Sequence, residues 1–164
     1  MQATFIVTRA TMSDLNVIAS LFDKYRQFYE QQPDIEKAKA FMEDRLTMDD
    51  SVVFIAKERD NLEEGLGFTQ LYPSFSSVSM EKIWILNDLY VESKARKAGV
   101  ARLLMKEAES FAAQTRAKSV VLKTAKNNEP ARHLYQSLGY QKDEAFDHYG
   151  LDIHSKTGGN MSGE

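Results

Sequence analysis

A basic segment with one glycine carries residue types that favour phosphate binding. Residues 96–101, Arg-Lys-Ala-Gly-Val-Ala, follow an apolar stretch that ends at Val91. Apolar residues at helical spacing come after Gly99, so we expect a strand, a tight turn and then a helix that begins near this glycine. Backbone N–H groups at a helix start lack intrahelical acceptors and lie at the positive end of the helix dipole. Gly99 and Ala101 keep bulky side chains away from these groups, which would let a phosphate approach the backbone.

The same spacing also fits a plain strand-to-helix turn with a solvated basic face. Two other phosphate motifs do not fit, because a dinucleotide-binding turn has G-x-G-x-x-G and a P-loop has G-K-S/T after a second glycine, whereas only Gly99 is present here. A net charge of −3 and a pI of about 5.7 argue against general nucleic-acid binding, since such proteins are more often basic. We therefore expect any anionic ligand to be held by the local basic cluster around Arg96.

The composition is that of one globular domain of 164 residues without cysteine. The lack of cysteine excludes disulfides, a thiol nucleophile and thiolate metal sites, and it fits a reducing compartment. The three histidines are scattered, so we expect no metal site. Residues 1–10 lack the apolar core of a signal peptide, and no run approaches the ~20 apolar residues of a membrane span, so we expect a cytoplasmic protein without membrane partners. We expect the domain over residues 1–154 and a disordered, Gly/Ser-rich tail over residues 155–164.

The hydrophobic pattern predicts a sheet with helices on its faces. Segments rich in β-branched and aromatic residues predict strands, and apolar residues at helical spacing predict four helices. The expected strands are residues 4–10, 51–57, 65–72, 83–91, 119–124, one that opens at Tyr140, and 146–153; the expected helices are residues 11–29, 34–47, 99–111 and 128–138. Both hairpins and crossovers are needed to connect them. We therefore expect an α/β (α+β) fold with a mixed, mainly antiparallel central sheet of about seven strands flanked by four helices.

Two motifs, taken in order, resemble those of the GNAT superfamily of N-acetyltransferases. Arg96-x-x-Gly99-x-Ala101 is similar to the family's acetyl-CoA motif, Q/R-x-x-G-x-G/A. Residues 128–140, Asn-Glu-Pro-Ala-Arg-His-Leu-Tyr-Gln-Ser-Leu-Gly-Tyr, resemble its second block, N-x-x-A-x-x-L-Y-x-x-x-G-F/Y. Residues 87–91, Asn-Asp-Leu-Tyr-Val, also resemble the branch that contains yeast histone/polyamine and spermidine/spermine acetyltransferases.

This resemblance, which covers about residues 4–153, implies a GNAT-like acyl-CoA acyltransferase fold and acetyl-CoA as a co-substrate, without a metal. It implies that acetyl-pantetheine pairs with the strand at Leu89 and Val91, that the turn into the helix holds the pyrophosphate, that Asn128 contacts the CoA arm and that Tyr135 protonates the departing thiolate. The cofactor-binding residues that it implies are Leu89, Tyr90, Val91, Arg96, Lys97, Ala98, Gly99, Val100, Ala101, Asn128 and Tyr135. A phenol suits this role, because tyrosine titrates near ~10 and a thiol near ~8.5. Core packing beside Leu134 is the alternative role for Tyr135.

The catalytic base is less directly implied. A thioester is already activated, so the enzyme needs position, an oxyanion donor and proton handling. A lysine-like amine has a pKa near ~10.4, so freeing its lone pair at neutral pH costs roughly 4 to 5 kcal/mol. Related enzymes often carry a glutamate where this sequence has Asn87 or Lys123. Asp88 is the nearest carboxylate, as a base acting directly or through water, or alternatively as a hydrogen-bond acceptor at the strand end.

The activity implied by the resemblance is transfer of acetyl from acetyl-CoA to a primary amine, by direct attack in a ternary complex. The amine would be a small polyamine, another amino compound or a lysine side chain, and its candidate contacts are Tyr29, Glu30, Tyr72 and Asp88. The alternative is a non-catalytic acyl-CoA sensor or interaction module that keeps the fold. Acetyl-CoA and an amine are the expected partners, nucleic acid is not, and a homodimer is a family-level expectation.

Overall fold

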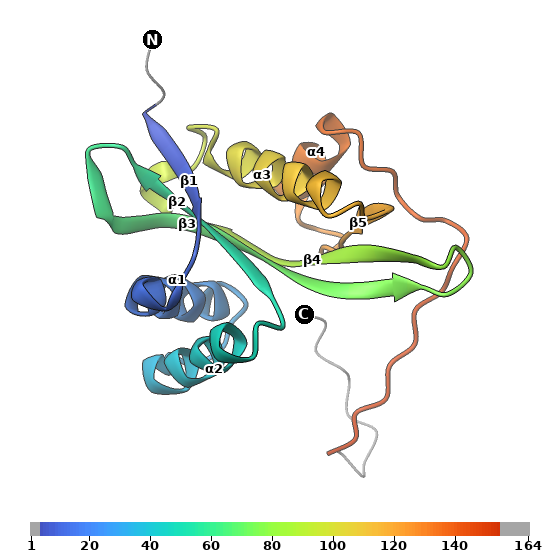
Figure 1. The fold of residues 1–164 in the computed structure, drawn as a ribbon, viewed down its shortest axis with the longest axis horizontal. Coiled ribbons are helices and arrows are strands. Elements are labelled where there is room, and N and C mark those ends of the chain that lie inside the picture. The colour runs from blue at the N-terminus through green and yellow to red at the C-terminus, as the bar shows by residue number, and fades with distance from the viewer. Residues whose placement is uncertain (1–3, 155–164) are drawn as a thin grey trace. The chain divides into compact units, whose positions relative to one another are not determined.

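The structure, a computed structural model, describes residues 4–154, which divide after Leu122 into two compact units. The elements of the first unit are β1 (Phe5–Arg9), the short 3-10 helix η1 (Met12–Asp14), α1 (Leu15–Phe28), α2 (Ile35–Met48), β2 (Val52–Glu58), β3 (Asn61–Ser76), β4 (Glu81–Val91), the 3-10 helix η2 (Ser93–Ala95), α3 (Val100–Gln114) and β5 (Ser119–Val121) (Figure 1). The second unit contains α4 (Glu129–Ser137).

The first unit is built on a five-stranded sheet in the order β1-β2-β3-β4-β5. Neighbouring strands from β1 to β4 are antiparallel, whereas β5 pairs in parallel with β4. The predicted mixed, mainly antiparallel sheet is therefore confirmed. β2 is buried from Val52 to Ala56, which agrees with its uninterrupted apolar sequence.

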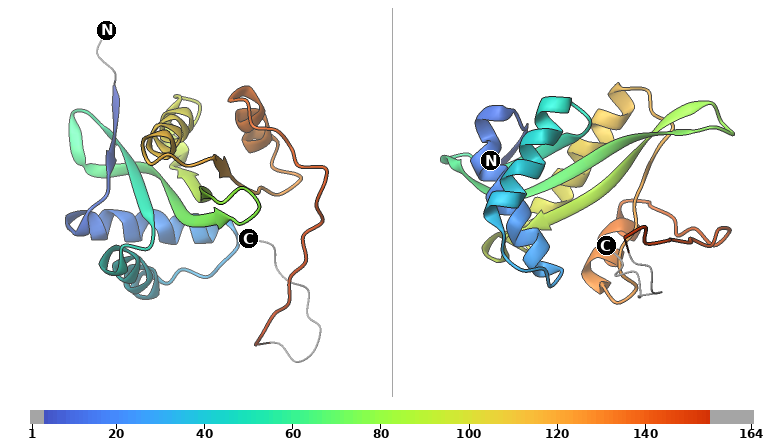
Figure 2. Two further views of the ribbon diagram at one scale, coloured as in Figure 1. Left: turned by 45° about the vertical axis from the view of Figure 1, so that its right-hand side comes forward. Right: turned by 90° about the horizontal axis from the view of Figure 1, so that it is seen from below.

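Helices cover both faces of this sheet, because each presents one apolar stripe. α1 and α2 pack on one face and α3 packs on the other (Figures 1 and 2). The core on the α1 side contains Ile18, Met42 and Phe68. On the α3 side, the rings of Trp84 and Phe111 lie with their centroids 5.1 Å apart. With α4, the described residues contain the four predicted helices.

The predicted strands at Tyr140 and over residues 146–153 are wrong, since residues 4–154 contain five strands rather than about seven. A strand needs a partner edge for its N–H and C=O groups, and a sheet face for its side chains. No register pairs residues 140–153 with another described segment. Phe146, Tyr149 and Leu151 are 73%, 94% and 81% exposed, so these aromatic and apolar residues do not mark a half-buried strand.

The tail predicted over residues 155–164 lies outside the described residues. Within residues 4–154, no helix combines the length and the apolar character that crossing a membrane requires.

Candidate active site

The pairing of β4 changes at Asn87. Gln70 of β3 pairs with Asp88, but Leu71 pairs with Leu86, so one residue of β4 is left over. Asn87 therefore forms a β-bulge, a feature that re-aims the side chains that follow it.

The bulge exchanges the two faces of β4. Trp84, before the bulge, packs on α3 through Phe111. After it, Val91 lies on the α3 side, since a Cβ added at Gly67 would meet both Val91 and Leu104 of α3. Even-numbered residues before Asn87 and odd-numbered residues after it thus face α3. Asp88 falls on the opposite face, which α1 covers.

A buried carboxylate and a buried amide lie together at this point of the sheet. Asp88 is 4% exposed and Gln70 is 0% exposed. The Nε2 of Gln70 donates to Oδ2 of Asp88 at 2.8 Å, and the Nδ2 of Asn87 donates to Oδ1 at 3.0 Å. Burial penalises the carboxylate charge, and these two neutral donors stabilise it. The main-chain carbonyl of Asp88 also accepts a 2.8 Å hydrogen bond from Oγ1 of Thr69, which holds the strand at the bulge.

Tyr29, at the end of α1, lies within reach of the charge of this carboxylate. Burial, and then the negative charge of Asp88, raise the pKa of Tyr29 above its ordinary value, so its phenol stays protonated near neutral pH. Tyr72 is half-buried and lies two residues after Gln70 on β3, which puts both side chains on the same face. Glu30 is exposed in the turn after α1, with a φ of 63°. The structure thus brings Tyr29 close to Asp88 and leaves Glu30 on the surface.

The second half of β4 has one open edge. β5 pairs with Ile83, Trp84 and Ile85, and the later residues of β4 pair, within the described chain, with β3 alone. The N–H of Glu92 donates to the carbonyl of Leu66 at 2.8 Å, so Glu92 faces the β3 side. In an antiparallel strand, the backbone N–H and C=O groups of every second residue point to the same edge, so those of Tyr90 also face β3. The backbone groups of Leu89 and Val91 then point to the open edge.

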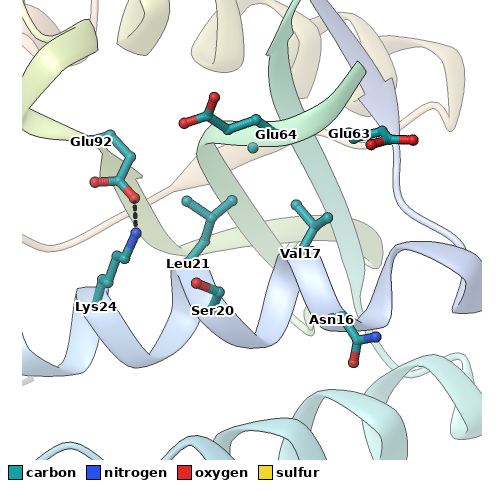
Figure 3. A pocket seen from close by; sticks show the side chains of 9 residues that line it. Asn16, Val17, Ser20, Leu21, Lys24, Glu63, Glu64 and Glu92 are labelled. Atoms are coloured by element: carbon teal, nitrogen blue, oxygen red, sulfur yellow. Dashed lines mark hydrogen bonds and ion pairs between the residues drawn. The ribbon is translucent and has the colours of Figure 1, made fainter. Parts of the chain in front are cut away.

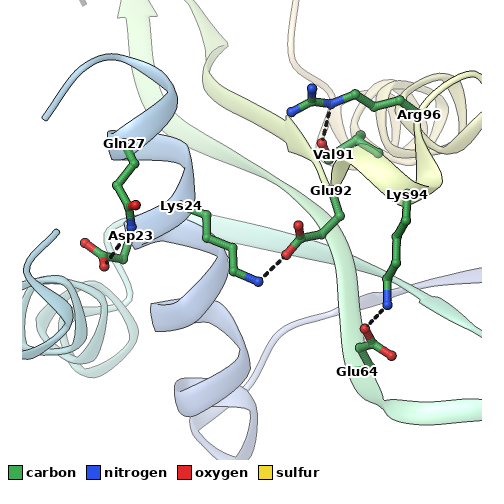
Figure 4. Close-up of polar contacts among 8 residues, drawn as sticks. All are labelled: Asp23, Lys24, Gln27, Glu64, Val91, Glu92, Lys94 and Arg96. Carbon is green, nitrogen blue, oxygen red and sulfur yellow. Dashed lines mark hydrogen bonds and ion pairs between the residues drawn. The ribbon is translucent and has the colours of Figure 1, made fainter.

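Arg96 closes the turn that follows β4. Its Nε donates to the main-chain carbonyl of Val91 at 2.9 Å (Figure 4). Its guanidinium lies 5.6 Å from the ring centroid of Phe28 and 5.9 Å from that of Tyr90. Tyr90 is partly buried against the α1 core. Burial, and then Glu92, raise its pKa, so its ring contributes an uncharged surface beneath Arg96.

The helix start after this turn is open. Gly99 is the N-cap of α3 with a φ of 85°, and Lys97 also has a positive φ of 63°. No atom lies within 4 Å of a Cβ added at Gly99, so backbone conformation rather than crowding requires glycine here. The first turn of α3 contains no acidic residue, and no side chain caps it. Lys97, Ala98 and Gly99 are exposed, Val100 is buried and Ala101 is half-buried.

In contrast to the start of α3, a pocket beside this turn is lined by acidic residues. This pocket of about 290 Å³ is lined by Asn16, Val17, Ser20, Leu21, Lys24, Glu63, Glu64, Gly65 and Glu92 (Figure 3). Lys24 pairs with Glu92 at 2.5 Å, and Lys94 pairs with Glu64. The hydrogen bond to Glu64 raises the pKa of Lys94 and directs its charge toward this rim. None of the residues singled out in the sequence lines the pocket.

In the second unit, Asn128 and Gly139 delimit α4. The Oδ1 of Asn128 accepts from the N–H of Ala131 at 3.3 Å, so this side chain is the N-cap. Gly139 has a φ of 92°, and the N–H of Tyr140 donates to the carbonyl of Tyr135 at 3.0 Å, which is a Schellman C-terminus. Tyr135 is half-buried, with its ring centroid 6.0 Å from that of Tyr140.

The sequence profile of the acetyltransferase (GNAT) family matches residues 17–140. The chain belongs to this family. It is an acetyltransferase, and enzymes of the GNAT family use acetyl-CoA as the acyl donor.

This GNAT acetyltransferase is 45% identical over 150 residues to an uncharacterized N-acetyltransferase of Bacillus subtilis, YhfO, which covers 92% of this chain and 99% of that protein. The crystal structure of a probable acetyltransferase superposes with a TM-score of 0.86 at 39% identity, over 92% of this chain and 99% of the other. A predicted acetyltransferase from Clostridium acetobutylicum, solved with acetyl-CoA, has a TM-score of 0.70 at 15% identity, over 90% of this chain and 96% of the other, and shows the shared fold.

The sequence did not point to Gln70 of this GNAT acetyltransferase. Asn87 and Asp88 were expected near the site, and the structure joins Asp88 by a hydrogen bond to a buried glutamine on the neighbouring strand. The signal was present, because Gln70 follows Phe68 by two residues in a strand whose Phe68 side is buried. A polar residue on the buried face of a strand marks a polar partner on the next one.

Proposed function

We propose that this acetyltransferase transfers acetyl from acetyl-CoA to a primary amine, by direct attack of the amine in a ternary complex. The observation that carries the proposal is the second half of β4. There, an open strand edge leads into a helix start without acidic residues, and a buried carboxylate lies on the same strand. These are the parts that donor binding and proton transfer require.

The donor would lie along the open edge. Backbone groups of Leu89 and the N–H of Val91 would pair with the pantetheine arm, and one N–H would polarise the thioester carbonyl. The N–H groups at the start of α3 would hold the pyrophosphate, with Arg96 and Lys97 as nearby positive charges. The open space around Gly99 supports this assignment, because a phosphate must approach the backbone closely.

The proton of the attacking amine would pass to Asp88. Asn87 and Gln70 hold its two oxygens by hydrogen bonds, so the carboxylate is oriented before the substrate arrives. The nitrogen lone pair forms the N–C bond, the C–S bond breaks with its electron pair on sulfur, and the thiolate takes a proton from Tyr135. Asp88 then returns its proton to solvent, and Tyr135 recovers one.

The acceptor would be a cationic amine in solution, such as a polyamine or a lysine side chain. Asp88 supplies the negative charge that attracts it. Tyr29 and Tyr72 present aromatic surface on the same face of the sheet, which suits the alkyl chain of an amine and the cation itself. Glu30, exposed in the turn after α1, would receive a second amino group of a polyamine.

Release of the CoA thiol over a panel of amines tests the proposal. The panel contains putrescine, spermidine, Nα-acetyl-lysine amide, an aminoglycoside and glycine, with acetyl-CoA held at saturation. We expect turnover with at least one cationic primary amine and none without an amine. Binding of acetyl-CoA by calorimetry without turnover on any amine would contradict the proposal and favour an acyl-CoA sensor.

A further inference from the structure

Gln70 is held in one orientation by its neighbour. An ionised carboxylate only accepts hydrogen bonds, so the amide must present its Nε2 to Asp88, as it does at 2.8 Å. The Oε1 of Gln70 is thereby forced to face elsewhere. It is buried, and no group of the described residues donates a hydrogen bond to it.

A buried acceptor without a donor is uncommon in a folded protein, and it calls for a physical explanation. Here the acceptor belongs to the same amide that binds the carboxylate. Asp88 keeps a small exposed fraction of 4%, and the side chain of the adjacent Asn87 is exposed. Asp88 thus reaches the surface at the bulge, whereas the Oε1 of Gln70 is enclosed on the amide bound to it and is offered no hydrogen bond by the described residues.

We propose that the Oε1 of Gln70 accepts one N–H of the substrate amine while Asp88 accepts the other, so that this pair selects primary amines. The inference rests on the proposed function, because it names a second contact of the same nitrogen. Gln70 then touches the substrate and orients the nitrogen lone pair, which is the part of the amine that neither oxygen contacts.

The atoms of the reaction support this division of roles. An ammonium substrate first releases one proton to solvent and leaves a neutral amine with two N–H groups and a lone pair. As the N–C bond forms and the C–S bond breaks, one of these protons passes to Asp88. The other stays on the product amide and remains donated to Gln70. A secondary amine has a single N–H, which Asp88 takes, so Gln70 is left without a donor.

The test compares a primary amine with its N-methyl derivative in two proteins. Nα-acetyl-lysine amide and its Nε-methyl form serve as the pair, or else the best amine of the panel above and its N-methyl form. We expect the natural enzyme to favour the primary amine in kcat/KM by at least about tenfold. Gln70→Met, which keeps length and removes both polar atoms, should lower kcat/KM for the primary amine more than for the methylated one, so that the preference falls several-fold.

Two controls separate this role from a structural one. Gln114→Met makes the same substitution at the exposed end of α3 and should leave both rates unchanged. If Gln70→Met does not fold, Gln70→Asn keeps the amide but withdraws it by one methylene, and the same loss of preference is expected. Equal losses for the two amines, as a bound water at Oε1 would give, overturn the inference while the proposed function stands. No turnover by the natural enzyme on any amine removes the proposed function itself.

Discussion

The two halves of β4 are built differently, although they belong to one strand. Before Asn87 the strand is paired on both sides at Ile83–Ile85, and its buried side chains, Trp84 and Leu86, are apolar. After Asn87 it pairs, within the part of the chain that the structure describes, with β3 alone, and its buried side chains include a carboxylate. The first half is therefore suited to stability. The second half has one edge without a partner strand among residues 4–154 and carries the buried Asp88, and a single bulged residue separates the two halves.

We expect the largest effect on rate from a substitution of Asp88, the carboxylate in the second half of β4. If Asp88 accepts the proton, Asp88→Asn should lower kcat/KM near neutral pH by about 100- to 10,000-fold. Raising the pH should restore part of the loss, because solvent base then takes the proton that Asp88 would accept as the N–C bond forms. If Asp88 only attracts a cation, KM should rise with kcat little changed, and added salt should weaken the natural enzyme in the same way. Identical pH–rate profiles and KM values for the two proteins would remove both roles.

A comparable loss is expected outside β4 if Tyr135 is the acid. Tyr135→Phe should lower kcat by roughly 10- to 10,000-fold without changing acetyl-CoA affinity, since the interaction belongs to the transition state. Pre-steady-state measurement of thiol release, with calorimetry of acetyl-CoA binding, checks both parts. An unchanged kcat at saturating amine would leave Tyr135 with a packing role against Tyr140.

In the first half of β4, which pairs on both sides, we expect a substitution to change stability rather than rate. Leu86→Ala removes a side chain that is 3% exposed and should cost about 2 to 5 kcal/mol of unfolding free energy. Activity per folded molecule should stay near that of the natural enzyme. Urea denaturation with parallel rate measurement compares it with Asp88→Asn. A loss of rate as large as that of Asp88→Asn would show that the bulge does not separate the two functions.

At the start of α3, which follows the second half of β4, Gly99→Val should weaken acetyl-CoA binding by at least about tenfold. A β-branched residue is strained at a φ of 85°, and its side chain would cover the helix start. Gly139→Val is the matched control, because Gly139 has a φ of 92° and equally open surroundings in the other unit. We expect calorimetry to show weaker binding for the first variant alone. Normal binding by folded Gly99→Val would contradict the phosphate assignment.

Part of this arrangement could be predicted from the sequence. The four helices, the mixed sheet and the glycine at the start of α3 follow from periodicity and from the backbone needs of a tight turn. The bulge was also encoded, because the apolar residues Trp84 and Leu86 are followed by Leu89 and Val91, which shifts the alternation by one residue.

The parts of the fold and of the site that the sequence did not predict depend on contacts between residues far apart in the chain. The contact between Gln70 and Asp88 joins residues 18 positions apart, and only the register of β3 with β4 brings them together. The strands predicted after Gly139 are wrong for a related reason, because the apolar and aromatic residues of a segment do not specify a strand edge with which it can pair. Local sequence patterns thus predicted the helices and most of the strands. The buried pair of Gln70 and Asp88, and the absence of two predicted strands from residues 4–154, depend instead on how strands pair, which local patterns do not specify.

The smallest expected effect is a shift in the titration of one phenol, which reports the reach of the Asp88 charge. Burial is the larger cause of the raised pKa of Tyr29, and Asp88 is the second. Asp88→Asn should therefore lower the pKa of Tyr29 partway toward its ordinary value, while the pKa of Tyr90, raised by burial and Glu92, should not move. NMR titration of ¹³C-labelled tyrosine, assigned with Tyr29→Phe, measures both. A raised folded-state pKa adds stability that is present below the unfolded-state value and lost as the pH rises through the folded one, so this contribution should disappear only at alkaline pH. If the pKa of Tyr29 is the same in both proteins, the charge of Asp88 does not reach the end of α1, and Tyr29 would have no place beside the proposed amine.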